Sequence, residues 1–221
     1  MYKNLSKFLG LFLIPVLFLT GDCNIKNHQS SPLIENNKIN PDSNKVITDS
    51  NCSLDEALSG IDIPSRIRKM LTLVTVYYYS FDGRLHKGQI VINKNLAKEI
   101  QDIFKDIETR KFPIEKVIPI YKYDWNDEAS MKDDNTSAFN YRIVKGTKTL
   151  SKHATGRAID INPRLNPQIK KNLILPTGSY YNIQRPGTIS DSTFIVKIFL
   201  KKGWRWGGHW KHLKDYQHFE K

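Results

Sequence analysis

Four residues towards the end of the sequence are of types that could bind a metal ion and activate water. His153 and Asp160 are seven residues apart with Gly156 between them, so a turn could bring both side chains to one point. Asp215 and His218 follow later, three residues apart. Two histidines and one carboxylate form a three-ligand zinc site that leaves a fourth position open. A zinc ion lowers the pKa of water to about 7 and polarises a carbonyl, which is the chemistry that amide hydrolysis requires.

A further carboxylate that is not a ligand could act as general base and then as general acid. Asp215 is suited to that role by its closeness to His218 in the sequence. The spacing alone is weak support, because a histidine on a loop is usually solvated. His209 and His212, also three residues apart, form a rival pair of ligands. From the residue types alone, a metal site and a set of solvated side chains both stay open.

Two segments of the sequence resemble a family of zinc peptidases that includes D-Ala-D-Ala carboxypeptidases, D,D-dipeptidases and L-Ala-D-Glu endopeptidases. The family pattern is S-x-H-x-x-G-x-A-x-D, followed much later by (D/E)-x-x-H. The sequence matches it at Ser151, His153, Gly156, Ala158, Asp160, Asp215 and His218. The segments Asn135–Arg142 and Gly203–Glu220 are similar to the L-Ala-D-Glu endopeptidase branch. The resemblance is good from Met131 to Lys221 and loose from Ile61 to Ser130.

The resemblance implies a role for each matched position. His153, Asp160 and His218 would hold one zinc ion, and Asp215 would be the catalytic base. Arg142 would hold a substrate carboxylate or stabilise the oxyanion, since its guanidinium is planar and always charged. A surface ion pair is the alternative interpretation of this arginine. The fold implied is α+β, a small, largely antiparallel sheet flanked by helices, with zinc in a groove.

Three further residues are candidate substrate contacts. Ser151 could hydrogen-bond near the site or cap the turn before His153. His209 stands where the endopeptidase branch commonly has an acidic residue, so substrate specificity could differ there. Trp210 belongs to a segment with two other tryptophans, which are more typical of a core or a groove wall than of a recognition site. A packed indole still needs a partner for its N–H.

The segments that must position these residues also predict an α+β fold. Leu71–Tyr79 is rich in β-branched and aromatic residues and predicts a strand, and the Asp-Gly turn after it predicts a return strand over Gln89–Asn93. Apolar residues at helical spacing predict a helix over Leu96–Thr109. The other expected elements are a helix capped by Ser53, strands over Val117–Tyr123 and Ala158–Ile161, and a helix from Ser190 or Asp191 to about Lys202. This mixed order favours a largely antiparallel sheet over a doubly wound parallel one. His28 and His86 are expected at the surface.

The first 52 residues are predicted to precede the catalytic domain, which would span residues 53–221. Residues 1–23 have the features of an export signal, and Cys23 suggests lipoprotein processing. Asp22 is unusual at such a cleavage site, so simple secretion or an uncleaved anchor is equally compatible. Residues 24–52 are polar and predict a disordered tether. Cys23 and Cys52 could pair in an oxidising compartment, whereas acylation of Cys23 would leave Cys52 alone.

The composition narrows the class of partner. A net charge of +12 over 221 residues suits an anionic partner, and nucleic acid, acidic lipid and cell-wall polymer all qualify. The longest apolar run, Phe8–Leu19, is too short to span a bilayer, which excludes a polytopic membrane protein. The sequence contains no nucleic-acid-binding motif, and an export signal places the protein away from nucleic acid.

These observations together predict a monomeric zinc peptidase of the bacterial cell envelope, or a secreted one, that acts on peptidoglycan stem peptides. An L-Ala-D-Glu endopeptidase is favoured, and a D-Ala-D-Ala carboxypeptidase is the alternative. Contact with a membrane is expected only through the signal or a lipid anchor. A non-catalytic wall-binding module and a basic nucleic-acid-binding protein are the remaining hypotheses.

Overall fold

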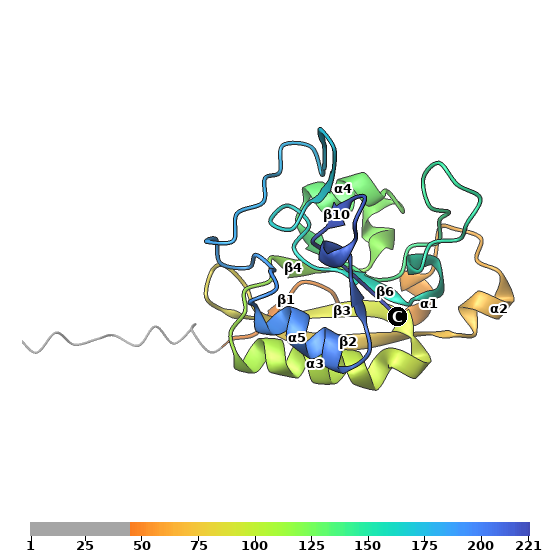
Figure 1. Ribbon diagram of the computed structural model, residues 1–221. Helices are drawn as coiled ribbons and strands as arrows, with labels where there is room; N and C mark the ends of the chain where they lie inside the picture. Colours follow the sequence, from red (N-terminus) through yellow and green to blue (C-terminus); the bar gives the residue numbers. More distant parts are fainter. Residues whose placement is uncertain (1–44) are drawn as a thin grey trace, which may run out of the picture. The chain divides into compact units, whose positions relative to one another are not determined.

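The computed structural model describes residues 45–221 of the chain. The expected export signal, Cys23, His28 and the tether up to residue 44 lie outside the described residues. The described part is a mixed α+β unit in which short helices accompany four small sheets, not the one sheet expected (Figure 1). Within residues 45–221, no helix is both long and apolar enough to cross a membrane.

A long hairpin is the largest element of the first sheet. β2 (Leu71–Tyr79) and β3 (Leu85–Asn93) pair antiparallel along their whole length. The predicted first strand is confirmed, and the return strand starts at Leu85, earlier than Gln89. β1 (Ile47–Thr48) adds to the other side of β3 in a parallel direction.

Residues 47–52, which precede the predicted start of the domain at Ser53, also contact the hairpin. Gln89 on β3 accepts a hydrogen bond from the backbone N–H of Cys52 at 2.7 Å. His86, expected at the surface, is only 8% exposed, and its Nδ1 lies 2.9 Å from a carboxylate oxygen of Asp49. A short edge strand held by polar contacts leaves little apolar periodicity in the sequence, which is why composition alone suggested a tether.

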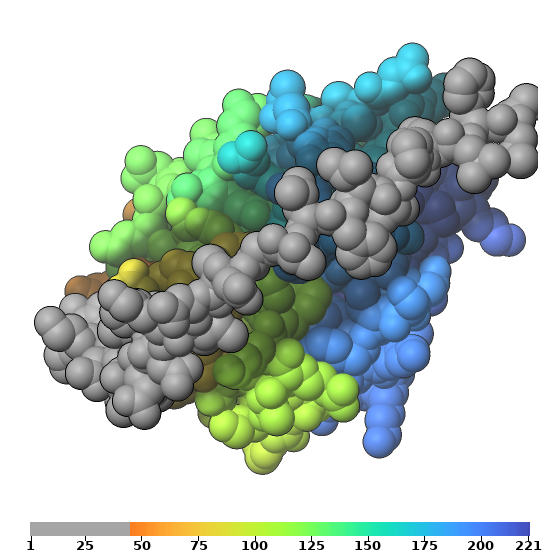
Figure 2. Space-filling view, turned by 90° about the vertical axis from the view of Figure 1, so that its left-hand side faces the viewer, coloured from red at the N-terminus to blue at the C-terminus, as the bar shows by residue number. Residues whose placement is uncertain are grey.

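One helix covers a face of the hairpin, and a second helix lies beside the first. α3 (Ala97–Thr109) buries an apolar stripe of four residues against β2, namely Ile100, Ile103, Phe104 and Ile107. Burial of each such side chain contributes about 1.5–3 kcal/mol to stability. α5 (Phe194–Lys201) lies beside α3, and Figure 2 shows these segments adjoining on the surface in yellow-green and blue. α5 starts later than predicted, because Ser190–Thr193 forms a turn in which Thr193 Oγ1 donates to Ser190 O at 2.6 Å.

Two further sheets lie beyond the hairpin and carry the candidate site. The first has the order β6 (Ala158–Asp160), β11 (His218–Glu220), β9 (Arg205–Trp206), and both of its pairings are antiparallel. The second has the order β10 (Lys214–Asp215), β7 (Gln168–Lys170), β8 (Leu173–Leu175), also antiparallel. The predicted strand over Ala158–Ile161 is thus confirmed, one residue shorter than expected.

The remaining elements are short. The helices are α1 (Leu54–Ala57), α2 (Ser65–Arg68) and α4 (Asp127–Lys132); the 3₁₀ turns are η2 (Lys94–Leu96), η3 (Ile120–Tyr123), η4 (His153–Thr155) and η5 (Gly207–His209). Ser53 caps α1 as predicted, in a reciprocal arrangement with Glu56. The predicted strand over Val117–Tyr123 is wrong. β4 (Lys116–Val117) pairs with β5 (Asn135–Thr136) and ends before Pro119, which lacks the N–H that a longer strand would need.

Candidate metal centre

Three of the residues singled out in the sequence form one buried cluster. The ligand atoms of His153, Asp160 and His218 lie within 4.8 Å of one another. Nε2 of His153 is 3.1 Å from Nδ1 of His218 and 3.2 Å from Oδ2 of Asp160. Nδ1 of His218 is 2.9 Å from Oδ1 of Asp160. Among residues 45–221, this is the one group of three potential metal ligands that comes so close together.

Strand register and a tight turn bring the cluster together. His218 on β11 stands directly opposite Asp160 on β6, and side chains at opposite positions are neighbours. His153 begins η4, where Ser151 Oγ accepts a hydrogen bond from the His153 N–H at 3.2 Å. The buried Ser151 therefore caps the turn, one of the two roles considered for it.

Gly156 closes that turn against the hairpin. Its φ is +62°, a left-handed conformation that glycine adopts without strain. A Cβ atom at this position would lie 2.6 Å from the backbone N of Asn93, at the end of β3. The backbone N–H of Asn93 donates to Gly156 O at 2.8 Å, which fixes the turn to the strand. The glycine of the motif is thus required by close packing next to His153.

Both histidines are oriented by contacts outside the cluster. Nδ1 of His153 donates to the backbone oxygen of Ala138, which can only accept, so Nε2 is left with a free lone pair. Nε2 of His218 lies 3.3 Å from Oε2 of Glu220, which leaves Nδ1 facing Asp160. Partners of this kind fix the tautomer and the ring orientation of metal-ligating histidines. We assigned no role to Glu220 from the sequence, although alternate residues of a strand share a face.

The donor set fits a zinc ion. Ligand atoms about 2.0–2.2 Å from a tetrahedral zinc are about 3.3–3.6 Å apart. The two imidazole nitrogens of the cluster are 3.1 Å apart, and each lies 2.9 or 3.2 Å from one oxygen of Asp160, slightly less than this spacing. Two imidazole nitrogens and one carboxylate are also a usual ligand set for catalytic zinc.

The electrostatics of the cluster favour a cation. Burial opposes ionisation of Asp160, but His153 and His218 hold its pKa well below the ordinary value. Burial would lower the pKa of His218, yet Asp160 and Glu220 raise it to about 10. The two carboxylates thus create a negative potential at the imidazole nitrogens, which favours a bound proton or a metal ion there.

Asp215, the predicted base, is buried on β10 opposite Gln168. Oδ2 of Asp215 accepts a hydrogen bond from Nε2 of Gln168 at 2.7 Å, whereas its Oδ1 is buried and has no partner. Burial raises the pKa of Asp215, His218 opposes this rise and the charge of Asp160 adds to it. Gly207 allows this packing, since a Cβ there would lie 2.5 Å from the backbone oxygen of Asp215. One free carboxylate oxygen with a raised pKa is what a general base requires.

Arg142 lies on the segment next to the turn of His153. Its backbone oxygen accepts from the N–H of Ser151 at 3.1 Å. Nη2 of Arg142 forms an ion pair with Asp127 at 2.9 Å, and its side chain is 33% exposed. The Nε of Arg142 is buried without a partner. The structure contains the ion pair that we considered as the alternative, and a substrate role for Arg142 stays a prediction.

The two rival histidines lie apart from the cluster. Nε2 of His209 contacts Oδ1 of Asp191 at 2.5 Å, and both side chains are exposed. The ring of His209 stands edge-on to Trp206, with centroids 5.0 Å apart. His212 is exposed. Neither His209 nor His212 belongs to the group of potential metal ligands.

The tryptophans divide between core and site. Trp204 and Trp206 are buried in the main core. As expected, each indole N–H finds a partner: Trp204 donates to Glu99 at 3.0 Å and Trp206 to a backbone oxygen at 2.9 Å. Trp210 is half-buried, and its ring lies 5.2 Å from that of His218. Trp210 is thus the tryptophan that lines the cluster.

Comparison with known proteins agrees with this geometry. Residues 145–221 match the family model described as D-alanyl-D-alanine carboxypeptidase. The matched segment contains all three residues of the cluster and Asp215, whereas Arg142 precedes it. No curated protein and no solved structure matches the chain. Residues 145–221 are thus similar to D-alanyl-D-alanine carboxypeptidases, and the buried His-Asp-His group lies within this similar segment.

Proposed function

We propose that the protein is a zinc peptidase that hydrolyses amide bonds in the stem peptides of peptidoglycan. The observation that carries the proposal is the buried cluster of His153, Asp160 and His218, with the unpartnered oxygen of Asp215 close to it. The family match over residues 145–221 supports the same class of reaction. A structural role alone would not explain why Asp215 is buried with one oxygen unsatisfied, since such a group costs about 1–3 kcal/mol or more.

The residues of the site have separate tasks in this mechanism. His153 and His218 would hold the ion through Nε2 and Nδ1, and Asp160 through its carboxylate. Bound zinc would supply a Lewis acid that polarises the scissile carbonyl and lowers the pKa of water. Asp215 would accept a proton from the attacking water at Oδ1 and pass it to the departing amine. Gln168 would keep the carboxylate of Asp215 in this orientation through its hydrogen bond to Oδ2.

Substrate binding would involve residues at the edges of the cluster. We propose that Arg142 exchanges its ion pair with Asp127 for a substrate carboxylate, which a guanidinium can bind with two parallel hydrogen bonds. Trp210 would form a wall of the groove beside His218. His209, which is exposed, would contact only the more distant parts of a substrate.

The bond that is cut distinguishes two activities. We favour an L-Ala-D-Glu endopeptidase, because the tryptophan-rich tail from Gly203 to Glu220 is similar to that branch. A D-Ala-D-Ala carboxypeptidase is the second candidate, favoured by the description of the matching family model. Export to the envelope, a monomeric state and possible acylation of Cys23 belong to the same proposal. The net charge of +12 supports it, since wall polymers are anionic.

Digestion of purified muropeptides of known sequence, followed by mass analysis of the products, tests the proposal. We expect cleavage between L-Ala and D-Glu, and loss of a terminal D-Ala would instead identify the second candidate. Asp215→Asn should retain zinc, and its turnover number should fall about 10²–10⁴-fold. Asp191→Asn, which removes an exposed carboxylate, is the matched control and should keep full activity. Intact muropeptides after digestion with the zinc-loaded enzyme would refute the proposal.

A further inference from the structure

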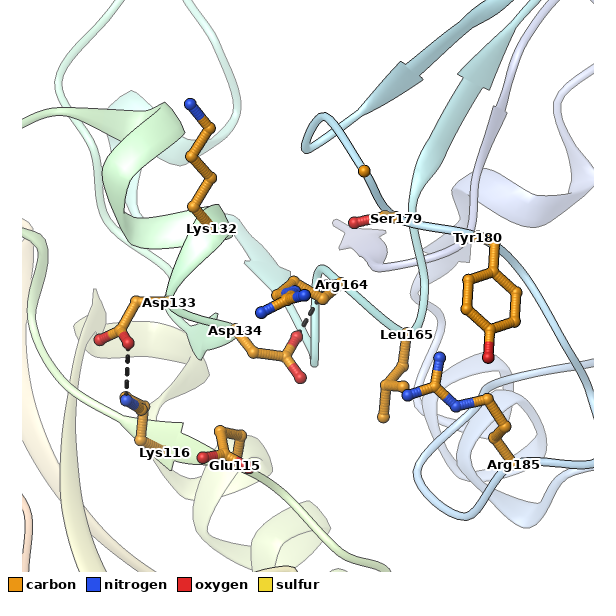
Figure 3. A pocket seen from close by; sticks show the side chains of 11 residues that line it. Glu115, Lys116, Lys132, Asp133, Asp134, Arg164, Leu165, Ser179, Tyr180 and Arg185 are labelled. Carbon is orange, nitrogen blue, oxygen red and sulfur yellow. Dashed lines mark hydrogen bonds and ion pairs between the residues drawn. The ribbon is translucent and has the colours of Figure 1, made fainter.

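A cavity separate from the metal cluster opens where the end of α4 faces the loop after β8 (Figure 3). Its volume is about 370 Å³. Its wall is charged and polar, and it includes Arg164, Arg185, Lys116, Lys132, Glu115, Asp133, Asp134, Ser179 and Tyr180. Neither Asp215 nor any residue of the His-Asp-His cluster lines it. We call this cavity the arginine pocket.

Neither arginine of the pocket forms a direct ion pair with an acidic side chain in the described part, although the charges of both lower the pKa of nearby Asp134. The lysines are engaged, because Lys116 pairs with Asp133 and Lys132 pairs with Glu128, each at 2.8 Å. Arg164 is held through its backbone N–H, which donates to Asp134 at 2.7 Å, and its guanidinium stays available. The guanidinium of Arg185 lies over the ring of Tyr180, 4.9 Å from the centroid. Two guanidinium groups without a direct ion pair in the same pocket favour an anionic ligand.

Ser179 provides a second and independent indication of a ligand. Its side chain is directed into the pocket (Figure 3) and the residue is only 9% exposed. Its Oγ is buried and has no hydrogen-bond partner. Leaving a buried hydroxyl unsatisfied costs about 1–3 kcal/mol, a cost that a bound acceptor would remove.

We infer that the arginine pocket binds a carboxylate group of the peptide substrate, through Arg164, Arg185 and the hydroxyl of Ser179. This inference rests on the proposed function, because a stem peptide carries carboxylates on several of its residues, some of them away from the bond that is cut. A singly charged, planar carboxylate matches a guanidinium fork. A doubly charged phosphate fits less well, since Glu115, Asp133 and Asp134 also line the pocket and repel the larger charge.

The chain connection limits the distance between the pocket and the metal cluster. Arg164 follows Asp160 by four residues, so their Cα atoms are at most about 14 Å apart. A fully extended peptide of four residues covers the same distance. Met131 on α4 is the neighbour of the pocket residue Lys132. Its sulfur accepts a hydrogen bond of 3.6 Å from Gln217. Gln217 lies between Asp215 and His218 in the sequence. α4 therefore contacts both the pocket and the segment that carries the catalytic residues.

Kinetics with two matched peptides test this assignment. One muropeptide carries a free carboxylate distant from the scissile bond, and the other has this group converted to an amide. In Arg164→Gln and Arg185→Gln we expect KM for the free acid to rise about tenfold or more, with KM for the amide and kcat nearly unchanged. Arg66→Gln, which removes an exposed arginine outside the pocket, should change neither peptide's KM. Equal effects on both peptides, or none on either, would overturn the inference.

Direct binding separates this inference from the proposed function. Calorimetric titration of the zinc-loaded Asp215→Asn enzyme uses the free acid, the amide and inorganic phosphate as probes. We expect the free acid to bind more tightly than the amide. Ser179→Ala removes no existing hydrogen bond, and it should weaken the binding of the free acid only. If the wild type cuts no muropeptide but this preference holds, the proposed function fails and the carboxylate site stands. Preference for phosphate, or equal binding of acid and amide, would overturn the site itself.

Discussion

Oε2 of Glu220 lies 3.3 Å from Nε2 of His218, and the two residues share one face of β11. This contact turns Nδ1 of His218 towards Asp160 on the neighbouring strand. Arg205 on β9 donates a hydrogen bond of 2.6 Å to the other carboxylate oxygen of Glu220. The carboxylate of Glu220 is therefore held by two partners. The end of the chain therefore positions a candidate ligand through a carboxylate that does not itself belong to the metal cluster.

Removing this carboxylate should weaken metal binding. In Glu220→Ala we expect the Kd for zinc to rise about 10–100-fold, because the ring of His218 loses the partner that fixes its tautomer. Competition with a chromophoric chelator measures the change. Arg205→Gln, which removes the other partner of Glu220, should leave the Kd within about threefold. An unchanged zinc affinity in Glu220→Ala would show that Glu220 has no positioning role.

The turn before β6 should depend on Gly156 for space as well as for its backbone conformation. Gly156→Ala places a Cβ 2.6 Å from a backbone nitrogen, whereas at Gly146, which also has a positive φ, nothing lies within 4 Å. Gly146→Ala should therefore cost only the left-handed strain of about 1–2 kcal/mol. We expect Gly156→Ala to cost about 1–3 kcal/mol more in the free energy of unfolding. Urea denaturation measures both values, and equal losses would refute the steric argument.

A buried carboxylate in the arginine pocket should make stability depend on pH. Burial raises the pKa of Asp134 from 3.8 to about 6. Between these values the folded state binds the proton more tightly than the unfolded state, so stability falls as pH rises through this window. Asp134→Asn should then be more stable than the wild type at pH 7, by about 1–2 kcal/mol, and equally stable below pH 4. The amide oxygen can still accept the hydrogen bond from Arg164.

The neighbouring acid provides a control of opposite sign. Burial opposes ionisation of Asp133, but its contacts with Lys116 and Tyr123 lower its pKa below the ordinary value. The stabilisation from Asp133 is therefore present at neutral pH and is lost as pH falls through that lowered value. Thermal unfolding at pH 4 and pH 7 should show Asp133→Asn less stable than the wild type at pH 7. An Asp134→Asn variant that is also less stable at pH 7 would contradict our account.

The meeting of His153, Asp160 and His218 could be predicted from the sequence because the combined motif resembles that of a known family, whereas the spacing alone was weak support. The long hairpin and α3 were also predictable, since their apolar patterns extend over many residues. The partners of the site residues were not. These partners are ordinary polar residues in the sequence, and only the folded chain brings them to the site. Asp127 contacts Arg142, Glu220 contacts His218, and Gln168 contacts Asp215. β1 was missed for a related reason, since two residues are too few for a periodic signal.

Titration of the metal-free enzyme with zinc, with hydrolysis of one muropeptide as the readout, tests the central claim most directly. We predict that the rate rises with added zinc and stops rising at one equivalent per chain. Asp215→Asn should bind the same single equivalent and stay inactive, whereas His153→Ala and His218→Ala should fail to bind it tightly. Full hydrolysis by the metal-free enzyme, or no hydrolysis after one equivalent of zinc has bound, would contradict the claim.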